Sequence, residues 1–483
     1  MAERPNILLI LTDQHRLSAA GAYGATPCKT PNIDRLAAAG TRFETVYTTC
    51  PLCSPARATI MTGAWPLRHG ITANVNNMTS ACHHLQDAPG LLPRRLQAQG
   101  YRTGYTGKWH LGDKRDAMYL GKRRAPWPNI ESLPRDFGFD GQNFPGHGNG
   151  GFGYPEYKEY LSANGWKHEK VGGELTGPVE STVPYFLTSH TMSLIDRYAE
   201  RDEPFFIWHN FWGPHGPYLA TREYNDMYRD VELPPWPNLE WPSRRIPGPH
   251  QVKINPRAES MTWQDDWQPR LRRYYAFATM IDDQIGRLLG HLEQTHLAEN
   301  TLVIFCADHG ETCGSHGGLM DKGYHHFEEI QRIPLIVEGP GVEAGAVRDE
   351  LVSLADVMPT ICDAAGDGGQ GDPIQGRSLS PLLRGESAAD WRDEVVVEFD
   401  GLNQGACSLR TLRCGPYKYG LNLAHEDELY DLQRDPWETR NLIDEPAYAE
   451  VAQDLRKRLF AWMQDADDQG LCAFRNKQRY YGC

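Results

Sequence analysis

The first candidate site consists of two short polar sequences that each follow an apolar run. Asp13 and Gln14 come directly after the first such run of the chain. Asp308 and His309 come directly after a later one. Ligand-binding groups collect beyond the carboxyl ends of strands in open α/β sheets, so the two sequences are expected to meet. A lone Asp after a strand is more often a helix cap, but two matching pairs favour a divalent-cation site.

The second candidate site is the sequence Cys53-Ser-Pro-Ala-Arg57, where a helix is expected to begin with Ser54 as its cap. A buried cysteine before an ordinary helix is the simplest structural interpretation. Cys50 and Cys53 also have the CxxC spacing of a redox pair or of half a zinc site. A zinc site would need a second Cys or His pair at ligand spacing, and none is clear. A thioredoxin-like motif would lie early in a much smaller domain, so neither alternative fits well.

Cys-x-Pro-x-Arg instead resembles the signature at which sulfatases have their cysteine oxidised to formylglycine. Other sequences resemble sulfatase motifs in the same order along nearly the whole chain. These are the segment around Asp34, the 106–112 motif with Lys108 and His110, His215 with 216–218, Asp308 to Glu311, His316, Lys322 with Glu328 and Glu329, and the tail sequences 417–419, 428–436 and 441–442. The resemblance implies an alkaline-phosphatase-like α/β fold, in which helices sandwich a large mixed, mostly parallel sheet, with a small C-terminal α+β subdomain.

The resemblance also implies a mechanism. Cys53, oxidised by a formylglycine-generating enzyme and then hydrated, would attack the sulfur of a sulfate monoester. The implied metal ligands are Asp13, Gln14, Asp308, His309 and the converted residue 53. Arg57 and Lys108 would hold the negative charge of the nucleophile, and His110 would act as base in its regeneration. His215 and Lys322 would bind sulfate oxygens and aid departure of the alcohol. Asn74 would contact the sulfate. A helix beginning near Cys53 would direct free amides at the same anion.

Two residues depart from the common sulfatase pattern. Gln14 stands where many members have a second aspartate, and His309 stands where many have asparagine. The change lowers the ligand charge and leaves open whether calcium or manganese is native. Calcium is the favoured ion, and manganese and magnesium are alternatives. This version resembles that of bacterial sulfatases, and it also occurs in the related phosphonate monoester hydrolases and phosphodiesterases, which are the alternative enzymes. A third hypothesis is a non-catalytic protein that binds sulfated ligands. The complete set of reactive residues argues against this hypothesis.

Alternating strands and helices are expected to position these residues. Buried strands are predicted at 6–12, 101–106, 204–211, 301–307 and 334–337, an extended segment at 41–49, and helices at 32–39, from 54–55 onward, at 91–99 and at 274–294. The stretches 143–184 and 214–267 are rich in Gly, Pro, Trp and Tyr and are predicted to be long excursions near the site. After about 383 the pattern changes to strands at 394–399, 408–413, 417–421 and 428–432 and a helix at 448–464. We therefore expect a catalytic domain at 1–383 and a C-terminal subdomain at 384–483.

The composition limits the partners. The chain of 483 residues carries 49 Lys and Arg against 63 Asp and Glu, a formal net charge of −14, which disfavours nucleic acid and anionic membranes as partners. No leader sequence and no apolar segment of membrane-spanning length is evident, so a cytoplasmic location is expected. The expected substrate is a small-molecule or carbohydrate sulfate ester. The tail 480–483 is a candidate contact in a homo-oligomer.

Overall fold

The computed structural model describes most of the chain. The described residues are 4–77, 79–112, 132–143, 150–167, 170–171, 173–240, 261–387, 389–401, 407–423, 425–468 and 470. The tail 480–483, a candidate oligomer contact, lies outside these residues.

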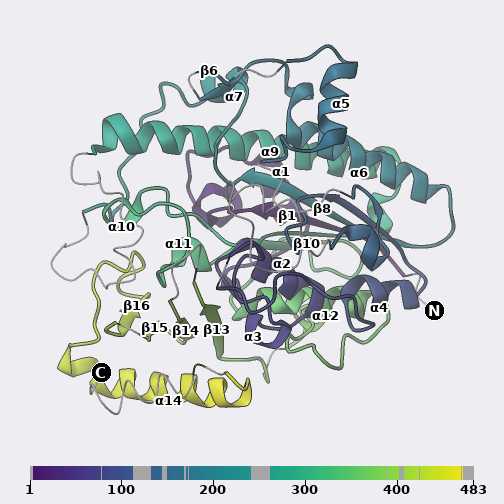
Figure 1. The fold of residues 1–483 in the computed structure, drawn as a ribbon. Helices are drawn as coiled ribbons and strands as arrows, with labels where there is room; N and C mark the ends of the chain where they lie inside the picture. Colours follow the sequence, from purple (N-terminus) through teal and green to yellow (C-terminus); the bar gives the residue numbers. More distant parts are fainter. Residues whose placement is uncertain are drawn as a thin grey trace.

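The larger part of the chain is built on one eight-stranded sheet with the order β11-β2-β10-β9-β1-β8-β4-β5 (Figure 1). β1 (Asn6–Asp13) lies between β8 (Phe205–Pro214) and β9 (Thr301–Ala307) and is parallel to both. β4 (Arg102–Gly107) extends the parallel run, whereas β10 (Leu335–Glu338) is antiparallel to β9. The short outer strands are β2 (Thr41–Phe43), β5 (Asp140–Gly141) and β11 (Ala346–Arg348). The sheet is mixed and mostly parallel, as the sequence predicts.

The side chains of β1 explain why helices cover both faces of this sheet. Ile7, Leu9 and Leu11 point into one apolar cluster, and Leu8 and Ile10 point into another, because successive strand residues face opposite sides. Helices α2, α4 and α12 lie on the first side and α1, α6 and α9 on the second (Figure 1). Their bounds are α1 (Pro31–Ala39), α2 (Cys53–Thr62), α4 (Leu92–Ala98), α6 (Val183–Ala199), α9 (Gln268–Gln294) and α12 (Val357–Ala364).

Shorter elements connect these layers. They are α3 (Pro66–His69), α5 (Pro155–Ala163), α7 (Arg222–Asp226), α10 (Ser315–Gly318), α11 (Glu328–Gln331), α13 (Ser380–Leu383), the pair β3 (Val46–Tyr47) and β12 (Val352–Ser353), and the pair β6 (Lys170–Val171) and β7 (Glu174–Leu175).

The sequence analysis misses one helix and misplaces one cap. The missed helix is α6, which begins at the end of the stretch 143–184 and packs against β8 and α9. Its start carries a Thr182 cap that accepts a hydrogen bond from the Tyr185 amide (3.4 Å), a signal hidden among Gly and aromatic residues. Ser54 does not cap α2, which begins at Cys53. The Ser54 hydroxyl instead donates to the carbonyl of His110 (2.6 Å).

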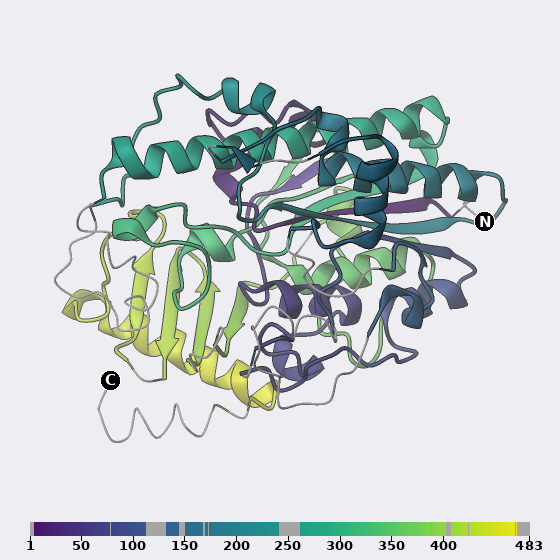
Figure 2. The ribbon, with the colours of Figure 1, turned by 45° about the horizontal axis from the view of Figure 1, so that its top comes forward.

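The C-terminal part forms a separate four-stranded antiparallel sheet. β13 (Glu394–Phe399), β14 (Leu409–Cys414), β15 (Tyr417–Asn422) and β16 (Glu428–Asp431) pair in chain order. α14 (Ala449–Asp465) packs its apolar side on this sheet (Figure 2). The meander and the final helix agree with the predicted α+β subdomain.

Buried ion pairs join this small sheet to the larger part. The Lys418 ammonium on β15 lies 3.1 Å from a carboxylate oxygen of Glu328 on α11 and also pairs with Glu438. Tyr47 on β3 donates to the same Glu328 carboxylate (3.0 Å). Burial raises the pKa of Glu328, but the charge of Lys418 and its neighbours lowers it by more, so the net shift is downward. Lys418 therefore compensates two buried carboxylates at this junction.

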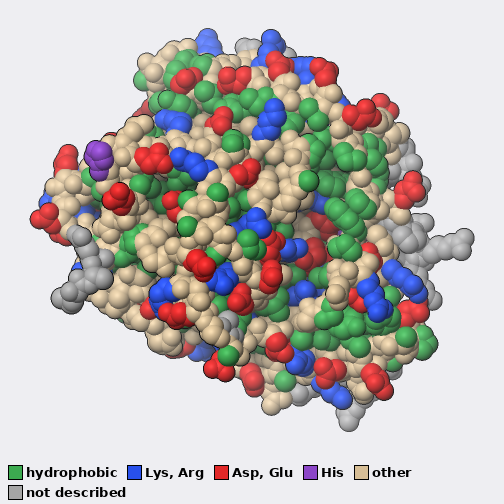
Figure 3. Space-filling view, turned by 180° about the vertical axis from the view of Figure 1, so that it is seen from behind, with side chains coloured by type: hydrophobic (Ala, Val, Ile, Leu, Met, Phe, Trp, Pro, Cys, Tyr) green, Lys and Arg blue, Asp and Glu red, His purple; other side chains and the backbone are tan. Residues whose placement is uncertain are grey.

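The surface is mixed in charge. On the face shown in Figure 3, acidic and basic side chains of the described residues are interspersed. Among the described residues, no helix combines the length and the apolar character needed to cross a bilayer.

We predict that Lys418→Met destabilises the protein. Removing one partner of a buried ion pair leaves an uncompensated charge, which typically costs about 3–5 kcal/mol. The loss is measured as a lower urea midpoint of unfolding. Lys457→Met is the matched control because Lys457 is exposed on α14, and its midpoint should stay at the wild-type value. Equal midpoints for both variants would contradict the role of Lys418.

Candidate active site

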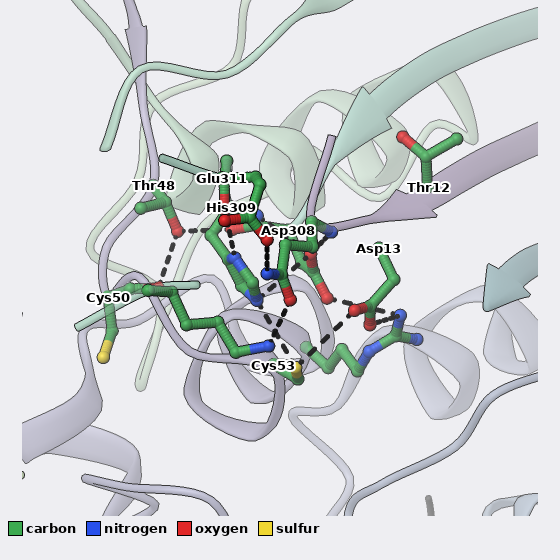
Figure 4. Close-up of polar contacts among 12 residues, drawn as sticks. Thr12, Asp13, Thr48, Cys50, Cys53, Asp308, His309 and Glu311 are labelled. Carbon is green, nitrogen blue, oxygen red and sulfur yellow. Dashed lines mark hydrogen bonds and ion pairs between the residues drawn. The ribbon is translucent and has the colours of Figure 1, made fainter. Parts of the chain in front are cut away.

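The two carboxylates meet because their strands are neighbours. Asp13 ends β1 and Asp308 follows β9, and the register pairs Thr12 with Ala307. The Asp308 amide donates to the Thr12 carbonyl (3.2 Å), which continues the pairing beyond β9. Both side chains are fully buried and point toward Cys53 (Figure 4). The expectation that the two strand ends form one site agrees with this geometry.

Cys53 is brought to the same point by the start of α2. Its sulfur lies 3.3 Å from Nε2 of His309 and 3.7 Å from Oδ1 of Asp13. The next amide of this helix, that of Ser54, donates to the side-chain oxygen of Asn74 (3.0 Å). Asn74 therefore lies against the first turn of α2, where helix amides favour an anion. Burial raises the pKa of the Cys53 thiol, but Lys108 and Lys322 help to lower it well below its ordinary value.

Two cations converge on Asp13. The Lys108 ammonium lies 2.5 Å from Oδ2, and a guanidinium nitrogen of Arg57 lies 3.0 Å from the same oxygen. Arg57 also lies 3.3 Å from Asp308. Burial raises the pKa of Asp13, but the positive charge of Lys108 and its neighbours holds it well below the ordinary value. Asp13 is therefore ionised at neutral pH despite full burial.

Asn210 is a member of this cluster that the sequence reasoning missed. Its side-chain oxygen accepts from Arg57 (2.7 Å), and it sits on β8 beside the end of β4. Gly107 allows the close approach, because a Cβ there would lie 1.8 Å from the Asn210 carbonyl oxygen and its φ is +96°. An Asn on a central buried strand is itself a usable signal, since a buried amide requires partners.

The buried donors fit a divalent ion. One ligand atom each from Asp13, Cys53, Asp308 and His309 lies within 4.8 Å of the others. Oδ2 of Asp308 is buried and has no hydrogen-bond donor among the described residues, apart from its ion pair with Arg57. Nδ1 of His309 faces the Gly310 carbonyl (3.0 Å), which assigns the proton to Nδ1 and leaves the Nε2 lone pair for an ion. Burial raises the pKa of Asp308 to about 7, and a bound cation would lower it.

Gln14 lies beside the ligand cluster in a constrained geometry. Its φ is +61°, and its backbone amide donates to Asp308 (3.0 Å). Its side-chain nitrogen donates to Glu311 and to Asp321 (2.9 Å), and its oxygen accepts from Lys322 (2.5 Å). Two carboxylates thus fix the direction of the amide. A carboxylate at position 14 would face both of them, and this like-charge repulsion explains why the chain has glutamine there.

The remaining predicted residues border the cluster. Nδ1 of His215 lies 2.7 Å from the Gly216 carbonyl, and its ring lines a cavity of about 550 Å³ that also reaches Gln14. Burial and the charge of Lys322 lower the pKa of His215 to about 4, and a bound anion would raise it. His110 is buried with φ +57°, and its carbonyl binds Ser54 at the start of α2.

The fold and the buried cluster define a metal-assisted ester hydrolase of alkaline-phosphatase-like architecture. The Sulfatase family model matches residues 5–367, and the model for the C-terminal region of N-sulphoglucosamine sulphohydrolase matches residues 314–465. The chain therefore belongs to the sulfatase family and is a sulfuric ester hydrolase.

Individual relatives match this chain along nearly its whole length. The chain is 30% identical to the uncharacterised sulfatase YidJ of Escherichia coli, over 96% of this chain and 88% of the relative. It is 28% identical to an N-acetylglucosamine-6-O-sulfatase of Bacteroides thetaiotaomicron, over 99% and 90%. The phosphonate monoester hydrolase of Agrobacterium radiobacter shares the fold with a TM-score of 0.76 at 24% identity, over 96% of both chains.

We predict that Gln14→Glu destabilises the metal-free protein by about 1–3 kcal/mol, because it replaces a donor by a third carboxylate beside Glu311 and Asp321. The like charges would raise the folded-state pKa of the introduced carboxyl, so the penalty is present at neutral pH. It begins to fall as the pH drops through that value and vanishes near the unfolded-state pKa of about 4.3. Thermal unfolding in chelator, from pH 7 to pH 5, measures it.

The double variant Gln14→Glu/Glu311→Gln restores one donor to this pair and should recover part of the loss. A Gln14→Glu protein as stable as wild type at every pH would show that Glu311 and Asp321 do not fix the amide.

Proposed function

We propose that the chain hydrolyses a sulfate monoester with a formylglycine made from Cys53 as the nucleophile. The sulfur of Cys53 occupies the position where the formylglycine oxygens would stand. The observation that supports the proposal is its contact with His309 (3.3 Å) and Asp13 (3.7 Å) at the first residue of α2. A CxxC redox pair would not need these neighbours.

We assign Asp13, Gln14, Asp308 and His309, with the converted residue 53, to one divalent ion. The ion would supply Lewis-acid polarisation of the sulfate oxygens. The oxygen donors favour calcium and keep magnesium as an alternative, and the imidazole of His309 keeps manganese as another.

The positive side chains then divide between two tasks. Arg57 and Lys108, which already touch Asp13, would balance negative charge on the nucleophile. His215 lines the cavity, and Lys322 contacts Gln14 at the cavity wall. There they would bind sulfate oxygens and donate a proton to the departing alcohol. Asn74, at the first turn of α2, would hold another sulfate oxygen.

His110 has a separate task. We assign it as the base that regenerates the aldehyde, because its carbonyl is fixed to Ser54, the residue after the nucleophile. Its buried position shields the imidazole from solvent during that step.

A sulfated carbohydrate is the proposed substrate class, since an N-acetylglucosamine-6-O-sulfatase is among the relatives. Conversion of Cys53 requires a formylglycine-generating enzyme as a maturation partner. The nine described cysteines are free thiols, which supports a cytoplasmic location. We retain the division into a catalytic domain at 1–383 and a C-terminal subdomain at 384–483.

A phosphonate monoester or phosphodiester hydrolase is the second candidate. Its support is the pair Gln14 and His309 together with the shared fold of the Agrobacterium enzyme. A binder without catalysis is less consistent with the site, because binding alone requires no convertible cysteine beside a ligand cluster.

We predict that Cys53→Ala lowers kcat on an aryl sulfate by roughly 10⁴-fold or more, because the nucleophile is lost. Its melting temperature should remain close to that of wild type. Cys50→Ala is the matched control, since Cys50 is equally buried but lies outside the ligand cluster, and it should retain most activity. Equal losses in both variants would favour a CxxC function, and full activity of Cys53→Ala would exclude the proposed nucleophile.

A further inference from the structure

The cavity beside the cluster is large enough for the alcohol part of a substrate. It measures about 550 Å³ and is bordered by Gln14 and His215 at its inner end. Tyr218 forms part of one wall. The first turns of α9 contribute Arg270 and Arg273 to another. An ester whose sulfate lies at the cluster would extend its organic part toward these arginines.

The carboxylates of this cavity already have hydrogen-bond or ion-pair partners. Glu311 accepts hydrogen bonds from Gln14, from the Tyr218 hydroxyl (3.0 Å), and from the amides of Cys313 (3.2 Å) and Asp321 (2.7 Å). The Asp321 side chain accepts from Gln14 (2.9 Å) and lies 3.6 Å from the Lys322 ammonium. Both carboxylates are therefore held by other partners, and among the described residues neither forms an ion pair with Arg270 or Arg273.

The two arginines that line the cavity have no carboxylate partner among the described residues. Arg270 and Arg273 are three residues apart on α9 and so share one face of the helix. Both are partly buried, and within the described ranges neither forms an ion pair with a carboxylate. Arg270 contacts the sulfur of Met320 (3.1 Å) and lies over the ring of Trp267 (5.5 Å). Partly desolvated guanidinium groups favour an anionic partner, and here the cavity supplies the space for one.

Gly173, which also lines the cavity, packs against Arg273. Its φ is +90°, and a Cβ there would lie 3.3 Å from Cδ of Arg273 and 3.4 Å from its Nη1. The backbone therefore packs directly against the arginine stem. Arg272, between the two, instead donates to the Val231 carbonyl (2.8 Å) and to Gln268.

We propose that Arg270 and Arg273 form a subsite for a second anionic group, a carboxylate or a second sulfate, on the alcohol that carries the scissile sulfate. This inference rests on the proposed function and narrows it to polyanionic sulfate esters. A guanidinium fork pairs with either anion through two parallel hydrogen bonds. The subsite lies beyond Gln14 and His215, so it recognises the leaving alcohol and not the group that is cleaved.

The test uses inert anions, so that binding is separated from turnover. Calorimetry compares benzenesulfonate with benzene-1,3-disulfonate and 3-sulfobenzoate on the metal-loaded enzyme. We expect at least one of the two dianions to bind roughly 10-fold more tightly or better, as charge-assisted hydrogen bonds imply. The preferred dianion identifies sulfate or carboxylate as the second group.

The Arg270→Gln/Arg273→Gln variant should lose this advantage while its affinity for benzenesulfonate stays within about twofold of wild type. Arg272→Gln, with the same change of net charge per residue on the same helix, should keep it. Matching melting temperatures show that the variants fold. Absence of the advantage in wild type, or its persistence in the double variant, would overturn the subsite. Intact dianion binding without cleavage of any sulfate ester would instead overturn the proposed function.

Discussion

The structure depends on keeping the Asp13 carboxylate ionised in a fully buried position. Two cations, Lys108 and Arg57, offset the free-energy cost of its burial, which is large for an unpaired charge. Asp13, Lys108 and Arg57 come from three different parts of the fold. β1 brings Asp13, the turn after β4 brings Lys108, and α2 brings Arg57 and Cys53. The order of strands β9-β1-β8-β4 is what makes these elements neighbours.

Ion pairs of two adjacent residues on α11 connect the ligand cluster to the C-terminal sheet. Adjacent residues of α11 point to two different networks. Glu328 pairs with Lys418 of the small sheet, whereas Glu329 lies 3.6 Å from Arg16 and 3.2 Å from His316. Arg16 follows Gln14 by two residues, and its backbone amide is fixed because it donates to the Tyr274 hydroxyl (2.7 Å). Packing of the C-terminal sheet and alignment of the ligand end of β1 are therefore coupled through α11.

Much of this arrangement could be predicted from the sequence. Short continuous apolar runs located β1, β8 and β9, and the polar residues after two of these strands indicated the site. The start of α6 was missed because its cap lies in a stretch of Gly and aromatic residues that resembles a loop. Asn210 and the orientation of Gln14 were missed for a different reason. Their roles depend on partners about 150 to 300 residues away in the chain, such as Arg57 and Glu311, and no local pattern encodes such contacts.

The most direct test of the sulfatase assignment is a comparison of kcat/KM for matched aryl sulfate, phosphate diester and phosphonate monoester substrates. The enzyme would be loaded with metal, and conversion of Cys53 would be confirmed by mass spectrometry. We expect the sulfate to be hydrolysed with the highest kcat/KM, because the motif of Lys108 and His110 resembles that of sulfatases and the matching family model is that of sulfatases. A clear preference for either phosphorus ester would contradict this and would make Gln14 and His309 the better guides to the reaction.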